Sequence, residues 1–210
     1  MLVVQMNALP TIVVLAAGLG SRFVGAGHKL AQPFGQLTVL GQTVSNAISS
    51  GLPVMVVTTR PFLADVSTLV ASQDVVLLDA VDAAPGNLGM AHSIAAGVAA
   101  RPQAAGWLIL PADMPMVKPA TLKDVANALA HHPVAFAQHR GRRGHPVGFS
   151  AELYSELVQL AGDAGARRIV ARYPSFGVEV SDPGVLIDID TTADLIAAKR
   201  VALTVDRTDG

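Results

Sequence analysis

The stretch that decides the fold is residues 12–30, which read Ile12-Val-Val-Leu-Ala-Ala-Gly-Leu-Gly-Ser-Arg-Phe-Val-Gly-Ala-Gly-His-Lys-Leu30. It opens with a β-branched apolar run, which predicts a buried strand of a parallel sheet. The run then breaks into a loop with glycines at positions 18, 20, 25 and 27. Glycine lets backbone N–H groups turn toward a ligand, and Arg22 and Lys29 add two cations to the loop. The stretch therefore predicts a phosphate-binding loop after a first strand.

Two better-known glycine loops do not fit this stretch. The dinucleotide fingerprint needs a sixth-position glycine, where counting from Gly18 gives Phe23, and an acidic residue about 20 positions further on. The first acidic residue of this chain is Asp65. The P-loop needs lysine and then serine or threonine after its second glycine, whereas Gly25 is followed by Ala26. A segment with cations and no acid favours a polyanion such as a nucleoside triphosphate.

The composition limits which kinds of protein and which partners the sequence is compatible with. The chain has 210 residues, 51% hydrophobic and 15% charged, against roughly 25% charged on average. We expect one domain over residues 1–210, with its core at about 11–205. A formal net charge of −1 gives no indication of nucleic acid or an anionic membrane as partner. Without cysteine, signal peptide or membrane-length apolar run, the sequence favours a cytoplasmic protein with no membrane association.

Strand and helix patterns alternate along the chain. Strands are expected at 12–15, 53–58, 74–78, 107–110, 134–137, 146–149, 176–180 and 185–189. Helices are expected at 37–50, 63–70, 91–100, from 119, at 151–160, at 163–171 and from a capping box at 191–194. This alternation predicts an open, mostly parallel α/β sheet with helices on both faces, which binds ligands beyond the carboxyl ends of its strands.

Acidic residues follow two of the expected strands. Asp113 comes after an apolar run and a proline, and Asp188 and Asp190 follow another apolar run. Carboxylates from separate strand ends can hold Mg²⁺ together with substrate phosphates. The alternative is structural: Asp113 shapes a turn and Asp190 caps the last helix. Beside a phosphate-binding loop, the set favours a magnesium site.

A basic segment, His139-Arg-Gly-Arg-Arg-Gly-His145, lies between two apolar strands. The structural alternative is an ordinary solvated turn between the two strands. In a chain with few charges, three arginines in seven residues favour an anionic acceptor instead, because the planar guanidinium suits phosphate. The segment Gly162 to Arg168 is either a second such loop or a plain helix start capped by Asp163. No Ser–His–Asp pattern is recognisable in the sequence.

These motifs carry a family resemblance. Leu-Ala-Ala-Gly-x-x-x-Arg with Lys29 downstream, Pro-Ala-Asp-Met-Pro, Gly-Arg-Arg-Gly-His-Pro-Val, Gly-Asp-x-Gly-Ala-Arg and Asp-Pro-Gly-Val-Leu-x-Asp-Ile-Asp-Thr occur in that order. The sequence resembles the molybdenum cofactor cytidylyltransferase-like nucleotidyltransferases, in the MobA-like NTP transferase superfamily. It departs from their usual pattern where His28 stands in place of asparagine and Ala112 in place of glycine.

The resemblance implies a single-domain Rossmann-like fold and an Mg²⁺-dependent enzyme. It would transfer a nucleoside monophosphate from NTP to the terminal phosphate of molybdopterin and release pyrophosphate. A molybdoenzyme or its maturation chaperone is an implied partner. The alternatives are transfer to another phosphorylated acceptor, such as a sugar phosphate or phospholactate, and a non-catalytic cofactor-binding or delivery protein. Alanine at Ala17, where a guanylyltransferase has glycine, favours CTP over GTP.

The resemblance also assigns roles by position. The expected catalytic residues are Arg22, Lys29 and Asp113. The expected acceptor-binding residues are Arg142, Arg143 and His145, and the expected metal ligands are Asp113 with Asp188 or Asp190. The expected nucleotide-binding residues are Leu15, Ala16, Ala17, Gly18, Gly20, Ser21, Arg22, Lys29, Gly89 and Ser93.

Overall fold

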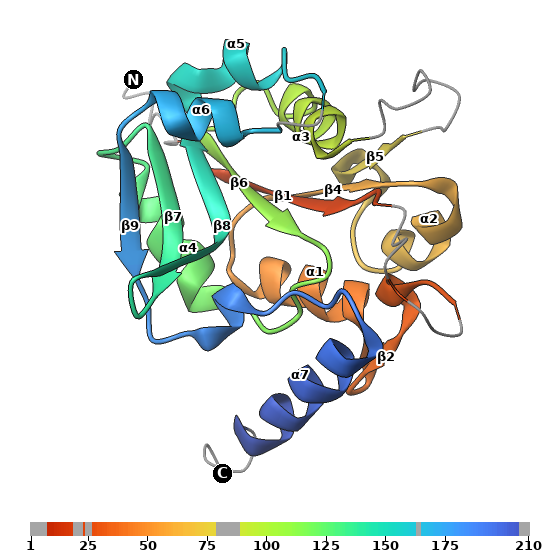
Figure 1. Cartoon of the computed structure of the whole chain (residues 1–210). Coiled ribbons are helices and arrows are strands. Elements are labelled where there is room, and N and C mark those ends of the chain that lie inside the picture. Colours follow the sequence, from red (N-terminus) through yellow and green to blue (C-terminus); the bar gives the residue numbers. More distant parts are fainter. Residues whose placement is uncertain (1–7, 19–22, 24–26, 79–88, 163–164, 206–210) are drawn as a thin grey trace, which may run out of the picture.

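One central sheet with helices on both faces organises the chain (Figure 1). The computed structural model describes residues 8–18, 23, 27–78, 89–162 and 165–205. Over these residues the sheet has seven strands in the order β5-β4-β1-β6-β8-β7-β9. Their bounds are β1 (Thr11–Ala16), β4 (Val54–Thr58), β5 (Val75–Leu77), β6 (Gly106–Pro111), β7 (Val134–His139), β8 (Arg142–Ser150) and β9 (Ser175–Glu179). A separate hairpin joins β2 (Pro33–Phe34) to β3 (Leu37–Thr38).

The sheet is mostly parallel. Strands β5, β4, β1 and β6 run in one direction, and β9 is parallel to β7. Strand β8 is antiparallel to both β6 and β7. The predicted α/β, Rossmann-like class is confirmed, and the antiparallel β8 brings the beginning of a strand, rather than its end, to the ligand-binding edge.

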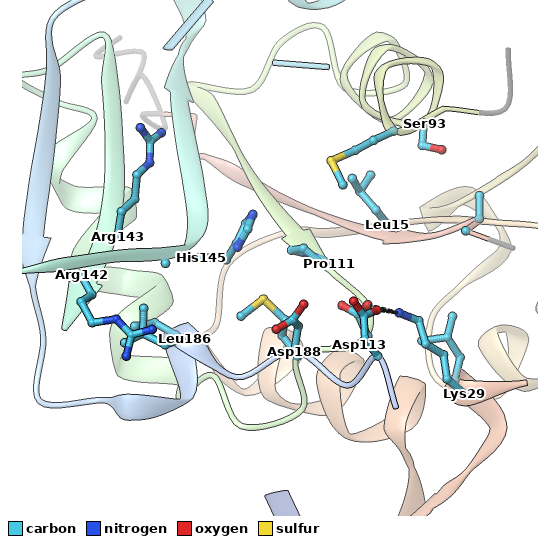
Figure 2. Close-up of a pocket in the computed structure, with 18 residues that line it drawn as sticks. Leu15, Lys29, Ser93, Pro111, Asp113, Arg142, Arg143, His145, Leu186 and Asp188 are labelled. Atoms are coloured by element: carbon cyan, nitrogen blue, oxygen red, sulfur yellow. Dashed lines mark hydrogen bonds and ion pairs between the residues drawn. The ribbon is translucent and has the colours of Figure 1, made fainter. Parts of the chain in front are cut away.

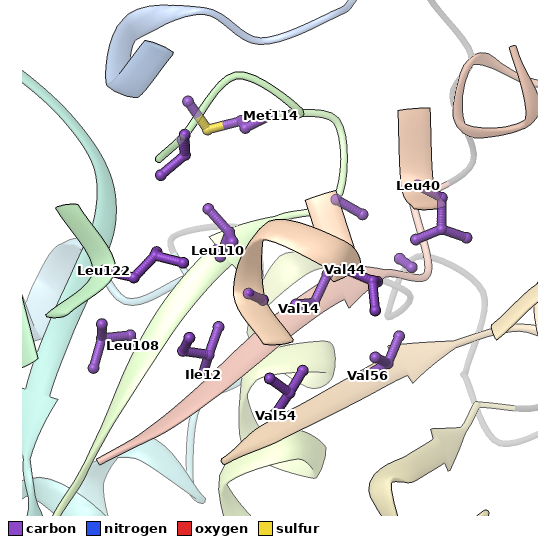
Figure 3. Packing of buried hydrophobic residues seen from close by; sticks show 14 of the residues in the cluster. Ile12, Val14, Leu40, Val44, Val54, Val56, Leu108, Leu110, Met114 and Leu122 are labelled. Carbon is purple, nitrogen blue, oxygen red and sulfur yellow. The ribbon is translucent and has the colours of Figure 1, made fainter. Parts of the chain in front are cut away.

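Alternate residues of β1 build two separate cores. Ile12 and Val14 face a cluster with α1, α2, α4 and α7, whereas Val13 faces a cluster with α3, α5 and α6. Figure 3 shows part of the first cluster, where β1, β4 and β6 meet α1 and α4. All residues of β1 except the partly buried Leu15 are buried, because helices cover both sides of the sheet. The helices are α1 (Val39–Ser49), α2 (Arg60–Ser67), α3 (Met90–Ala99), α4 (Pro119–Ala128), α5 (Tyr154–Leu157), α6 (Arg167–Arg172) and α7 (Thr192–Val205).

Several element boundaries differ from those predicted. Helix α1 begins only at Val39 because Thr38 accepts a hydrogen bond from the Gly41 N–H and caps it, after the short strand β3. Strand β8 takes in most of the predicted basic turn, leaving only Arg140 and Gly141 between β7 and β8. Residues 163–164 of the predicted helix at 163–171 lie outside the described residues.

The predicted strand at 185–189 is wrong. That segment is a 3-10 helix, η4 (Pro183–Leu186), followed by irregular chain. Asp182 accepts a hydrogen bond from the Gly184 N–H and so caps this turn. The sequence of a short apolar run does not show whether it pairs in a sheet or covers another loop. Contacts with distant residues determine that this segment does not pair in the sheet. Within the described ranges, no helix is both long and apolar enough to cross a membrane.

Helix α3 packs directly on the sheet through Gly97. A Cβ added there would lie 2.4 Å from Val13 Cγ1 and 2.8 Å from Val57 Cγ2. Both valines are fully buried on neighbouring central strands. They have little freedom to move aside, so the close approach requires glycine.

We therefore expect Gly97→Ala to lower the free energy of unfolding. Better helix propensity would favour alanine by about 1 kcal/mol, but overpacking against two central strands costs roughly 1–3 kcal/mol. Urea denaturation of the two proteins measures the difference. A more stable Gly97→Ala protein would contradict this and would mean that α3 can lift from the sheet at little cost.

Candidate active site

A cavity of about 530 Å³ opens at the carboxyl ends of β1 and β6 (Figure 2). Besides the segment 185–190, five parts of the described chain line it: the end of β1 with the residues directly after it, the 3-10 helix η1 (Lys29–Ala31), the first turn of α3, the end of β6 and the beginning of β8. The segment 185–190 closes another side. The cavity therefore collects residues that are up to 175 positions apart, from Leu15 to Asp190 (190 − 15).

The β1 end contributes one leucine and two small residues to this cavity. Leu15, Ala17 and Gly18 line it, whereas Ala16 is fully buried in the core beneath. Of the other nucleotide-binding residues predicted in this loop, Gly20, Ser21 and Arg22 lie outside the described residues. The described part of the loop thus offers backbone and short side chains at the sheet edge, as a close-fitting ligand requires.

Lys29 occupies the centre of the site. Its Nζ donates to Asp113 Oδ2 at 2.6 Å and to Asp190 Oδ1 at 2.7 Å. Its side chain is 12% exposed, and those of the aspartates are 17% and 21% exposed. Burial opposes the charged ammonium, but the hydrogen bonds and charges of the two aspartates outweigh it and raise the pKa of Lys29 above 10.5. Lys29 is therefore a fixed cation within the cavity.

The two carboxylate oxygens of Asp113 differ in their hydrogen bonding. Its Oδ2 accepts from Lys29, while its Oδ1 is buried and has no hydrogen-bond partner among the residues that the structure describes. Leaving a buried carboxylate oxygen unpaired is costly, so such an atom calls for an explanation such as an ion. Over the residues that the structure describes, no three His, Asp or Glu side chains form a ready metal cluster. The donor set nevertheless fits Mg²⁺, which takes one or two carboxylates and completes its shell with water and substrate phosphates.

The segment after η4 brings Asp188 and Asp190 to Asp113 without forming a strand. The Ile189 N–H donates to the Asp113 carbonyl oxygen at 3.0 Å, and the Ile189 side chain is fully buried. Alternate residues on either side of this anchor therefore face the cavity. In Figure 2, Asp188 lies beside Asp113 on the side away from Lys29.

The predicted capping box also forms. Thr191 Oγ1 accepts from the Asp194 N–H, and Asp194 Oδ2 accepts from the Thr191 N–H. Asp194 Oδ2 also accepts from the Asp190 N–H. These bonds start α7 directly after Asp190 and so fix the end of the segment that carries both aspartates.

The three predicted acceptor-binding residues come from the first half of β8. Arg142, Arg143 and His145 all line the cavity. Both arginines are exposed, and Figure 2 shows Arg142 directed toward Leu186. The Arg143 guanidinium lies 4.2 Å from the centre of the Phe136 ring, a cation–π contact that holds it on the sheet. Arg142 is therefore the more available cation of the two.

His145 faces the carboxylates across the cavity. Burial lowers its pKa below 6.5 and the charge of Arg143 lowers it further, while Asp113 and Asp188 act in the opposite direction. The net effect favours the neutral imidazole near pH 7. His145 therefore offers one donor and one acceptor to a ligand, and no charge.

Helix α3 contributes Met90 and Ser93, whereas Gly89 is the N-cap residue of that helix and does not line the cavity. Met90 is 56% exposed, and it was not expected from the sequence. Met114 and Leu186 also line the cavity and were missed. Only their positions next to predicted site residues could have indicated them, because apolar side chains carry no chemical signal.

Residues 12–176 match the family model of the MobA-like NTP transferase domain. The chain belongs to the MobA-like NTP transferase family. It is thus a nucleotidyltransferase by family, and the matched segment contains the β1 loop, Lys29, Asp113 and the basic half of β8.

Solved structures of related proteins support this assignment. The chain is 28% identical to Rv0371c from Mycobacterium tuberculosis H37Rv, with a TM-score of 0.76, and the match covers 91% of this chain and 98% of that one. A second structure of Rv0371c is a complex with manganese. A nucleotidyl transferase from Methanothermobacter thermautotroptrophicus is 27% identical, with a TM-score of 0.75 over 94% and 99% of the two chains. A comparison with curated proteins found no match.

The lowered pKa of His145 predicts a loss of stability in mild acid. The unfolded chain takes up a proton at this side chain near pH 6.5, while the folded protein does so only at lower pH. Between those values the unfolded state binds more protons, so the free energy of unfolding falls as the pH falls. We expect His145→Gln to flatten this decline in denaturation curves measured from pH 7.5 to 5. His131→Gln, at an exposed site, is the control. If the free energy of unfolding of the His145→Gln protein falls with pH as steeply as that of this control, the prediction is wrong.

Proposed function

We propose that this protein transfers a nucleoside monophosphate, from CTP in preference to GTP, to the terminal phosphate of a molybdopterin-type acceptor and releases pyrophosphate. One observation carries the proposal. A single cavity joins the loop after β1 and Lys29, which suit a triphosphate, to the arginines of β8, which suit a second phosphate. The carboxylates of Asp113 and Asp188 lie between these two basic regions (Figure 2). We take the whole chain as one transferase domain.

On the nucleotide side, the loop backbone from Leu15 to Gly18 would receive the nucleoside, with Ser93 across from it. Arg22 and Lys29 would offset the charge of the triphosphate. Lys29 is already charged and oriented, so it needs only to exchange one carboxylate contact for a phosphate oxygen. Preorganised charges of this kind stabilise a transferring phosphoryl group without reorganisation during the reaction.

Mg²⁺ would bind with the nucleotide at Asp113 and Asp188, where it would offset negative charge on the phosphates. The unpaired Asp113 Oδ1 supports this placement. Asp190 is engaged by Lys29 and held at its backbone by Asp194, so Asp188 is the better candidate for the second ligand. The manganese complex of Rv0371c supports a divalent ion in this family.

On the acceptor side, Arg142 and Arg143 would bind a phosphate and His145 would donate a hydrogen bond to it. An acceptor phosphate is already ionised at neutral pH, so its oxygen can attack the α-phosphorus without a general base. A new P–O bond forms there while the bond to the β-phosphate breaks, and pyrophosphate leaves with that electron pair. The protein's part is to place the two substrates in line and to neutralise charge.

Ala17 supports the choice of CTP. It lines the cavity and is only 5% exposed, so its methyl group narrows the site where glycine would leave room for a purine. One methyl group discriminates by only about 1–3 kcal/mol. Hydrogen bonds from the loop backbone to the base would have to supply the rest of the preference.

The decisive experiment measures pyrophosphate release with equal CTP and GTP, with and without molybdopterin, and identifies products by mass. We expect acceptor-dependent release and mainly CMP transfer, and Ala17→Gly should increase the GMP fraction. Mainly GMP transfer by the wild-type protein would overturn the base assignment. Turnover only with a sugar phosphate or phospholactate would overturn the acceptor, and no turnover with any NTP would favour a cofactor-delivery protein.

Asp113→Asn tests the metal assignment separately. Removing the carboxylate charge should lower transferase activity by roughly two to three orders of magnitude, as expected when a group that stabilises the transition state is lost. Mn²⁺ binding in the presence of NTP, followed by electron paramagnetic resonance, should weaken in parallel. Asp124→Asn on the exposed face of α4 is the matched control. Normal Mn²⁺ binding in the Asp113 variant would remove Asp113 from the metal site.

A further inference from the structure

His28 joins the two ends of the glycine loop. Its Nε2 lies 3.1 Å from the Gly18 carbonyl oxygen, and its Nδ1 accepts a hydrogen bond from the Leu30 N–H at 3.2 Å. Because Nδ1 is the acceptor, the ring proton is on Nε2, which therefore donates to Gly18. One imidazole thus connects the chain leaving β1 to the chain entering η1, ten residues later.

The orientation of this ring is set by the core. Phe62 of α2 contacts the His28 ring edge-on, with 4.6 Å between ring centres and 64° between ring planes. Phe62 is only 6% exposed and belongs to the core cluster on that face of the sheet. An edge-to-face contact with a buried ring restricts the rotation of His28. The His28 ring is therefore already oriented for its two hydrogen bonds.

The residues that His28 connects are those of the cavity. Gly18, Lys29 and Leu30 line it, whereas His28 does not. A ligand that contacts both Gly18 and Lys29 needs these two parts of the chain at a fixed spacing. Holding them at that spacing in advance lowers the entropic cost of binding. His28 therefore acts on a ligand only through its neighbours.

We propose that His28 is a positioning residue for the NTP: its bond to the Gly18 carbonyl oxygen holds Gly18 and Lys29 at the spacing that the nucleotide requires. This inference rests on the proposed nucleotidyltransferase function. It places the effect in NTP affinity and not in the acceptor side of the cavity, since Arg142 to His145 come from β8. The role depends on the Nε2 donor, and the Nδ1 acceptor serves mainly to cap η1.

Two substitutions at His28 distinguish the contribution of the Nε2 hydrogen bond from that of the Nδ1 hydrogen bond. His28→Gln can place an amide donor near the position of Nε2, whereas His28→Asn retains an acceptor near Nδ1 but is too short to reach Gly18. We expect His28→Asn to raise the dissociation constant for a non-hydrolysable NTP by about five- to tenfold, the range of a lost hydrogen bond, and His28→Gln to stay within about twofold of the wild type. KM for the acceptor at saturating NTP should be unchanged in both. His131→Asn, at an exposed site outside the cavity, is the control for the substitution itself.

The measurements are calorimetric binding of the NTP analogue, steady-state kinetics, and thermal denaturation of each variant. A purely structural His28 would give equal losses for both variants that follow their melting temperatures. Either that result or unchanged NTP affinity in His28→Asn would overturn the inference while leaving the proposed function intact. If the wild-type protein binds none of the NTPs, the proposed function is wrong and this inference falls with it.

Discussion

The ion pairs of Lys29 with Asp113 and Asp190 hold together three parts of the chain that are far apart in sequence. The partners are 84 and 161 residues from the lysine. Each charge is mostly withdrawn from water, so removing the lysine would place two carboxylates close together without its positive charge, which is unfavourable. The 3-10 helix η1, the end of β6 and the segment before α7 depend on this contact for their relative positions. On the proposed function, a nucleotide phosphate that draws Lys29 away would also free carboxylate oxygens for a cation, and the two binding events would be coupled by charge.

The sheet itself was predictable because its signal is local. Buried parallel strands are continuous apolar runs, and the runs in β1, β4 and β6 are separated by helices with clear apolar faces. The mostly parallel direction of the strands and the two-sided covering of the sheet follow from that alternation. The loop glycines and Lys29 were recognisable for a similar reason, since their residue types are unusual directly after a strand.

The features that could not be predicted from the sequence depend on contacts between residues that are far apart in the chain. The segment at 185–189 has the composition of a strand, but one bond from Ile189 to the Asp113 carbonyl and the cap at Asp182 hold it across a loop instead. The sequence gives no signal for the role of His28, because both of its hydrogen-bond partners are backbone groups. Arg143 was expected to face a ligand, yet Phe136 on the neighbouring strand offers it a stacking surface. In each case the sequence gives the residue but not its partner.

The antiparallel direction of β8 has a consequence for how such a protein can diversify. The four parallel strands support the glycine loop, Lys29 and Asp113, whereas the arginines stand at the start of a hairpin strand whose turn, at Arg140 and Gly141, is open to solvent. Residues can be exchanged or inserted at that turn without shifting the register between β1 and β6. On the proposed function, one half of the cavity could be remodelled for a new partner molecule while the other half keeps its chemistry. Substrate range and reaction type would then lie on separately variable parts of the same sheet.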